Sequence, residues 1–426
     1  MKENRYIRLL KHRSFMAFWG STTLLRLASN VLQFALAIYV LDLTGSALVY
    51  SSVLSIIIIP RILCTSAAGY FADVKDSIQI LQKGTLALVW LMAGFLAIHV
   101  LVLPLNLILI DVLVVCLELC ETFLAPSEGK ALNCIVSEEE IAPASKIASL
   151  DDGIVELMSP VIGSVFYGFL GLTGVLAIAM VIEILAFFMA ACIRHRPGHQ
   201  LERGQERQAC SFTKAKGAFR EAVYCLKENP YVIGIILFAP LFNFFVNPLF
   251  SVAAPHYFRV TMSADVQMYA MFNMALGIAG LAAPFLAMLL IDDKAEYKAN
   301  QGGTAACAAV LLGLAGILYF KKDAASSNEP LYLVTGGMML IVAVITIMNI
   351  ASVITVKKSI PESIMGRMIS LIQLCAVVSV PLGQLFYGLC ADRFPITSLL
   401  LISVCGLGIT FAVMHRTYRA IRRGEK

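Results

Sequence analysis

Gly163-Ser-Val-Phe-Tyr-Gly168 recurs 220 positions later as Gly383-Gln-Leu-Phe-Tyr-Gly388, in a chain of 426 residues. The offset is therefore close to half the length of the chain. Similarity at one long, fixed offset is typical of a protein built from related units. We predict that the two halves fold into the same arrangement of elements.

A second repeat has nearly the same offset. Asp73-Val-Lys75 and the following Gln82-Lys-Gly84-Thr85 recur, 219 positions later, as Asp292-Asp-Lys294 and Gln301-Gly-Gly303-Thr304. Where two similar apolar halves form one membrane bundle, the interface between the halves is the natural place for a substrate.

The composition requires the lipid bilayer as solvent. Hydrophobic residues make up 59% of the chain and charged residues 14%, and the mean hydropathy is +0.81, whereas soluble domains carry about 25% charge. A soluble core could not bury this much apolar surface. The net charge of +5 comes from basic residues in short loops and tails. This pattern lacks the basic stripe of a nucleic-acid binder, so no nucleic-acid partner is expected.

Twelve apolar runs are long enough to cross a bilayer, which takes about 20 residues. With six runs in each half, the sequence predicts an all-α membrane protein of two pseudo-symmetric six-helix bundles. We expect an N-terminal bundle over 1–193, a cytoplasmic linker over 194–230 with an amphipathic surface helix, and a C-terminal bundle over 231–426. The predicted spans are 15–41, 46–72, 79–101, 104–126, 148–171, 173–193, 231–256, 266–291, 303–320, 331–355, 368–390 and 396–415.

The positions of the basic residues predict the orientation, because cytoplasmic loops are rich in Lys and Arg. With the N-terminus placed in the cytoplasm, 27 of the 33 Lys and Arg residues lie on the cytoplasmic side and 4 on the opposite side. Both termini are therefore predicted to be cytoplasmic.

Acidic residues inside the spans are candidates for function, because an ionisable side chain in the bilayer costs on the order of 2.5–3.5 kcal/mol. In the fourth span Asp111 and Glu118 are seven positions apart and share a helix face, and Glu121 lies one turn further on. A carboxylate in such an apolar wall can load and unload a proton near neutral pH. Asp152, at the start of the fifth span, is a further coupling or gating candidate. The alternative for all four is a structural network between helices.

Arg26 and Asn30 share a face of the first span. A buried Arg needs a carboxylate partner, which a contact with the fourth span would supply while leaving another acid available for a proton. The spans of the second half contain almost no charged residues and carry amides instead. Asn243 and Asn247, four positions apart in the seventh span, mirror Arg26 and Asn30 as candidate substrate contacts, and hydrogen bonding between helices is the alternative.

The sequence carries no catalytic or cofactor signature. HExxH, GxSxG and Walker A motifs are missing, and the 11 cysteines lack zinc-ligand spacing. We expect no enzyme activity, no metal and no cofactor. Without a nucleotide-binding loop, transport would depend on an ion gradient or on facilitated diffusion.

The loop after the second span, Gly69-Tyr-Phe-Ala-Asp73-Val-Lys75, resembles the signature loop of the major facilitator superfamily. Ser159-Pro160 with Gly163 resembles the Gly- and Pro-rich motif in the fifth span of the family's drug/proton antiporters. The order of features along nearly the whole chain is similar to the macrolide-efflux branch of bacterial multidrug exporters. The resemblance implies a gating role for Gly69, Asp73, Lys75, Pro160 and Gly163.

The resemblance also implies a mechanism in which two six-helix bundles rock around a central cavity. Asp111 and Glu118 would be proton sites there, and Asn243, Asn247 and Asn349 would be cavity amides. The expected function is proton-coupled efflux of amphipathic drugs or related small molecules, by a monomer in the bacterial cytoplasmic membrane. The alternatives are a permease for a specific polar solute or siderophore and a non-transporting membrane sensor or scaffold.

Overall fold

The computed structural model describes residues 8–9, 11–102, 106–195, 230–290, 296–320, 329–359 and 362–424. The regular elements in these residues are all helices, and no strand occurs among them. The predicted linker and its amphipathic helix lie almost wholly outside the described residues.

Contacts within the chain define two compact units. The first unit comprises Met1–Val40 and Ile56–Ala209, and the second comprises Leu41–Ser55 and Cys210–Lys426. The segment Leu41–Ser55, although it comes early in the sequence, therefore groups with the C-terminal helices.

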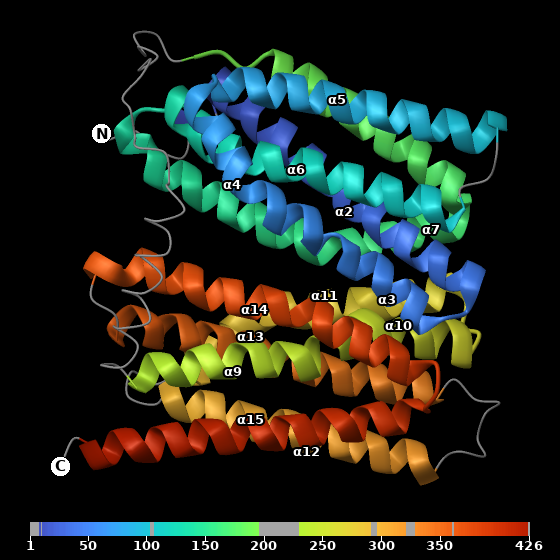
Figure 1. Cartoon of the computed structure of the whole chain (residues 1–426), viewed down its shortest axis with the longest axis vertical. Helices are drawn as coiled ribbons and strands as arrows, with labels where there is room; N and C mark the ends of the chain where they lie inside the picture. Colours follow the sequence, from blue (N-terminus) through green and yellow to red (C-terminus); the bar gives the residue numbers. More distant parts are fainter. Residues whose placement is uncertain are drawn as a thin grey trace. The chain divides into compact units, whose positions relative to one another are not determined.

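The first unit contains most helices of the N-terminal half (Figure 1). α5 packs against α6 and α7, and α4 packs against α6. Gly171 in α7 has φ 63° and ψ −172°, a conformation that suits a residue without a Cβ. The long helix breaks there into two segments, as predicted for 148–171 and 173–193. The helices are α2 Arg13–Thr44, α4 Ile58–Val74, α5 Ser77–Ala97, α6 Leu107–Ile135 and α7 Glu138–Ala191.

The second predicted span is divided into two helices, α3 Ala47–Ile56 and α4. Pro60 explains the division, because proline lacks an N–H and its ring crowds the carbonyl four residues earlier. That carbonyl belongs to Ile56, where α3 ends. The break coincides with the boundary between the two units.

The second unit contains the remaining helices. α9 packs against α14 and α15, α12 packs against α13 and α15, and α11 packs against α13. Two π-helical turns, Leu249–Ala253 and Tyr257–Thr261, flank the short helix α10 Ala254–His256. The longer helices are α9 Pro230–Pro248, α11 Val266–Leu290, α12 Glu296–Phe320, α13 Glu329–Ser359, α14 Glu362–Ala391 and α15 Ile396–Gly424.

The described helices account for the twelve predicted spans. Nine segments are long and apolar enough to cross a membrane, with Met158–Ala191 counted once. Gly171 divides that segment into two. α6 falls outside the nine, in keeping with the acidic residues along it, and Cys375–Ala391 in α14 is a shorter apolar helix. With these two helices the predicted fold of two six-helix bundles is confirmed.

The glycines of the first sequence repeat occupy equivalent positions. A Cβ atom on Gly163 of α7 would lie 2.9 Å from the ring of Phe34 and 3.1 Å from the carbonyl oxygen of Val31, both in α2. A Cβ atom on Gly383 of α14 would lie 2.6 Å from the carbonyl oxygen of Phe244 in α9. Each glycine thus permits a close approach between the fifth and first helices of its half.

The glycines of the second repeat also correspond. A Cβ atom on Gly84 of α5 would meet Leu124 of α6 at 2.5 Å, and one on Gly303 of α12 would clash with Met348 of α13. In both halves the third helix therefore packs closely against the fourth.

The glutamines of the same repeat reach the sixth helix of each half. Gln82 donates a hydrogen bond to the carbonyl oxygen of Ala190 at the end of α7, at 3.1 Å. Gln301 Nε2 lies 3.4 Å from His415 Nδ1 in α15. The internal repeat thus corresponds to repeated helix contacts.

Candidate functional site

An ion pair joins α4 to α6 within the first unit. Arg61 Nε lies 2.6 Å from Glu118 Oε1, and its Nη2 lies 3.1 Å from Oε2, so the contact is bidentate. Glu118 is only 1% exposed, and its charge would be costly without this partner. Thr122 donates to the same carboxylate at 3.4 Å. Glu118, a predicted proton site, therefore has its charge balanced by Arg61.

Glu121 contacts α2. Its carboxylate accepts a hydrogen bond from the hydroxyl of Ser29, and Gln33 donates to that hydroxyl at 3.4 Å. A polar chain therefore links the first and fourth spans at this level.

Arg26 pairs with Glu128, an acid that the sequence analysis did not single out. Arg26 Nη2 lies 2.8 Å from Glu128 Oε2, and both side chains are partly exposed. The pair connects α2 with α6, the two helices between which a partner for Arg26 was predicted, but it lies closer to the end of α6 than Glu121 does. Asn30, the other candidate on this face, is half-buried.

Two acids in the spans have a buried oxygen without a hydrogen-bond partner in the described part of the chain. One is Glu183 Oε2, in the second segment of α7, on a side chain that is 1% exposed. It lies within electrostatic range of Glu121 and Cys120 of α6. The other is Asp111 Oδ1, near the start of α6. Isolated charge is costly in such surroundings, so each group is suited to holding a proton. Glu183 was not among the four coupling candidates, although an acid in an apolar span was the available signal.

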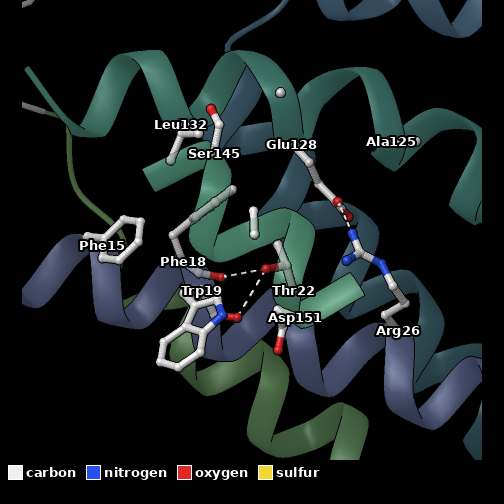
Figure 2. A pocket seen from close by; sticks show the side chains of 12 residues that line it. Phe15, Phe18, Trp19, Thr22, Arg26, Ala125, Glu128, Leu132, Ser145 and Asp151 are labelled. Atoms are coloured by element: carbon white, nitrogen blue, oxygen red, sulfur yellow. Dashed lines mark hydrogen bonds and ion pairs between the residues drawn. The ribbon is translucent and has the colours of Figure 1, made fainter. Parts of the chain in front are cut away.

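A pocket of about 260 Å³ lies among α2, α6 and α7. Figure 2 shows the rings of Phe15, Phe18 and Trp19 on one side of it and the Arg26–Glu128 pair on the other. The pocket lies toward the end of the unit where α2 and α7 begin and α6 ends.

Asp151 of α7 also lines this pocket. The hydroxyl of Thr23 donates to Asp151 Oδ2 at 2.6 Å. The side chain of the predicted candidate Asp152 lies outside the described part of the structure, so its role stays a prediction.

The signature loop, which leads from α4 to α5, contacts α6. Asp73 forms an ion pair with Lys130 of α6, and Lys130 also donates to the carbonyl oxygen of Ala72 at 3.1 Å. Lys75 Nζ lies 5.7 Å from the centroid of the Phe71 ring. A Cβ atom on Gly69 would meet no described atom within 4 Å, so described contacts do not explain glycine at this position.

Asp76, which the sequence analysis did not single out, caps the start of α5. Its Oδ1 accepts the backbone N–H of Ile78 at 2.9 Å, and its Oδ2 lies 2.9 Å from His195 Nε2. Among the other predicted gating residues, Gly163 packs on α2 as described above. The carbonyl of Pro160 accepts a hydrogen bond from Ser164 at 2.7 Å within α7.

Of the three predicted amides of the second unit, Asn247 belongs to a neutral hydrogen-bond network. Asn243 and Asn247 of α9 are half-buried, and Asn349 of α13 is exposed. Asn247 Oδ1 accepts from the hydroxyl of Ser251 at 3.3 Å, and Gln384 of α14 donates to the same hydroxyl at 3.2 Å.

A sequence model of the Major Facilitator Superfamily matches residues 18–384. Macrolide efflux protein A of Streptococcus pyogenes is 20% identical over 250 residues, which make up 58% of this chain and 60% of that protein. The chain thus spans about 60% of the length of the curated relatives it matches.

Solved structures match over almost the whole chain. A bacterial homologue of the iron transporter ferroportin, in an inward-facing state, has a TM-score of 0.68 at 15% identity, and the match covers 96% of this chain and 98% of that one. A D-xylose–proton symporter has a TM-score of 0.68 at 10% identity, over 96% and 97% of the two chains. At these identities the similarity concerns the fold.

Proposed function

The chain belongs to the Major Facilitator Superfamily and is a multi-pass membrane transporter of small molecules, and from this premise we propose that it exports amphipathic compounds in exchange for protons. The observation that carries the proposal is Glu183, an acid buried in a membrane span with an oxygen that no described group satisfies. In this position the protonated, neutral carboxyl group is tolerated, whereas the ionised carboxylate has a high free-energy cost. Proton uptake and release there can therefore bias one arrangement of the helices over another.

The other acids support a division of roles. Arg61 balances the charge of Glu118 in an ion pair, so we assign Glu118 a structural role. Asp111 resembles Glu183 in having an unpartnered buried oxygen. We propose Glu183 and Asp111 as the proton-binding groups, with Glu121 as the neighbour that senses the charge of Glu183.

The direction of transport is proposed from the basic residues and from the pocket. If the N-terminus is cytoplasmic, as the count of Lys and Arg predicts, the pocket lies toward the cytoplasmic end of its unit. An exporter loads its substrate from that side. The distant similarity to a macrolide efflux protein agrees with export from a bacterial cell, and a monomer is the simplest assembly.

Accumulation of a labelled macrolide and of lipophilic dyes, in cells that express the chain, tests this function. Accumulation should fall on expression and recover with a protonophore. Glu183→Gln and Asp111→Asn should abolish the protonophore-sensitive part at equal expression. Glu139→Gln, which alters an exposed acid at the start of α7, is the matched control and should behave like the wild type.

Two outcomes would redirect the proposal. Unchanged accumulation of the whole panel, together with uptake of one polar solute or siderophore, would favour a specific permease. Export that is insensitive to both carboxylate variants and to the protonophore would remove proton coupling.

A further inference from the structure

The pocket among α2, α6 and α7 has an unbalanced negative charge. Arg26 and Glu128 form one neutral pair at its wall. The third charged group is Asp151, which accepts a hydrogen bond from Thr23 but forms no ion pair with any described residue. With the carboxylates ionised, the described residues that line the pocket carry a net charge of −1, which favours a positively charged guest.

The wall of the pocket that faces the Arg26–Glu128 pair is aromatic. Phe15 and Phe18 are buried, Trp19 is half-buried, and all three line the pocket (Figure 2). The faces of aromatic rings attract organic cations, most strongly when water is excluded. Trp19 Nε1 has no hydrogen-bond partner in the described residues, so its ring can shift to admit a guest without breaking a hydrogen bond.

The volume limits the size of the guest. At about 260 Å³ the pocket is smaller than the roughly 300–1,000 Å³ that encloses a drug-sized ligand. It suits a small ammonium compound, or the charged end of a larger amphipathic molecule whose remainder lies outside.

We propose that this pocket binds the ammonium group of an organic cation, with Asp151 as its counter-charge and Trp19 and Phe18 as its aromatic walls. The inference rests on the proposed transport function and narrows its substrates to cationic amphipathic compounds. Thr23 is a positioning residue, because its hydroxyl holds the carboxylate of Asp151.

Fluorescence of Trp19 offers a direct readout of binding, because the chain contains only two tryptophans. The other, Trp90, is 71% exposed on α5. In the Trp90→Phe background, purified full-length protein in detergent is titrated with benzyltrimethylammonium and, separately, with its uncharged isostere neopentylbenzene. The cation should change the Trp19 emission saturably, and the isostere should bind at least about tenfold more weakly.

Variants of Asp151 test the charge. Asp151→Asn should weaken binding of the cation about tenfold, and Asp151→Glu should retain it. Asp265→Asn, an exposed acid in the second unit, is the matched control and should leave binding unchanged. Binding that is equal for the cation and the isostere, or unaffected by Asp151→Asn, would overturn the proposal, as would no change in Trp19 emission.

This measurement is independent of proton coupling. Saturable cation binding, with no proton-driven export by the same protein, would uphold the pocket and remove the proposed function. Export of uncharged compounds only, with no cation binding, would do the reverse.

Discussion

Two deeply buried contacts, one in each unit, join helices with different chemistry. In the first unit α4 and α6 are held by the ion pair of Arg61 with Glu118. In the second unit the hydroxyl of Tyr387 in α14 donates to the carbonyl oxygen of Phe245 in α9 at 2.9 Å, and it also bonds to Ser403 of α15. Glu118 and Tyr387 are equally buried, at 1% and 0% exposed.

The difference separates a contact that can gain or lose a proton from one that cannot do so by the same means. A neutral hydroxyl bonded to a carbonyl stays uncharged across the physiological pH range, whereas a carboxylate can gain or lose its charge. The same difference decides how much free energy a broken contact costs. A buried charge that loses its partner destabilises the fold more than a buried hydroxyl that loses its partner.

The largest effect is expected where a charge loses its partner. Arg61→Met leaves Glu118 buried without a counter-charge and should lower the free energy of unfolding by about 3–5 kcal/mol. Thermal unfolding of the purified protein in detergent measures this loss. The double variant Arg61→Met with Glu118→Gln should recover most of it, and equal instability of the single and double variants would contradict the argument.

The next effect should occur in both units, with the larger loss at Gly383, where the Cβ would meet a backbone oxygen at 2.6 Å. Gly163→Ala and Gly383→Ala each introduce a Cβ that meets a neighbouring helix at 2.9 Å or less, which should cost about 1–3 kcal/mol. Gly94→Ala and Gly313→Ala are matched controls, since a Cβ there meets nothing within 4 Å, and they should be neutral or slightly stabilising. A loss at only one of the two repeated glycines would break their equivalence.

A neutral contact in the second unit should cost less. Tyr387→Phe removes the hydroxyl that joins α14 to α9 and α15, and hydrogen bonds between membrane helices average about 0.6 kcal/mol, with a maximum near 1.7. The same unfolding assay should therefore show a smaller loss than Arg61→Met. Tyr332→Phe, at a side chain that is 62% exposed, is the control. A loss as large as that of Arg61→Met would remove the contrast between these two contacts.

The smallest effect concerns a charge outside the spans. Burial alone would raise the pKa of Glu140, but the hydroxyl and backbone N–H of Ser137 and the guanidinium of Arg8 together lower that pKa below its usual value. The folded state thus gains stability at neutral pH that is lost as the pH falls below about 4.3 and through the lowered pKa.

Arg8 is largely exposed, so the gain at neutral pH should be below about 1 kcal/mol. Unfolding of the wild type and of Glu140→Gln should differ at pH 7 and converge at pH 3. A difference that grows on acidification would contradict the assigned direction of the pKa shift.

The helices and their duplication could be predicted from the sequence, because span length and repeated motifs are local properties. The contacts of Gly163 with α2 and of Gly383 with α9 then follow from one fold used twice. Pro60 was visible as well, but its effect was not predicted, and the second span is divided after Ile56.

The pairing of charges could not be predicted, because it depends on how far each helix is shifted along its neighbours. Two arginines and several acids lie in the first four spans, and helix periodicity does not say which of them meet. Arg61 reaches Glu118, while Arg26 reaches Glu128 at the end of α6. Glu183 likewise lacks a hydrogen-bond partner for one oxygen because no described neighbouring side chain supplies a donor. The spacing of residues along the sequence does not reveal this.

The ion pair between α4 and α6 also bears on how the chain enters the membrane. α6 is too acidic to rank among the strongly apolar segments, and a charged residue at the centre of an inserting helix costs about 2.5–3.5 kcal/mol. α4 is synthesised earlier and brings Arg61 into the bilayer before Glu118 arrives. Arg61 can then pair with Glu118 and stabilise α6 in the bilayer. The orientation of every helix that follows depends on that insertion.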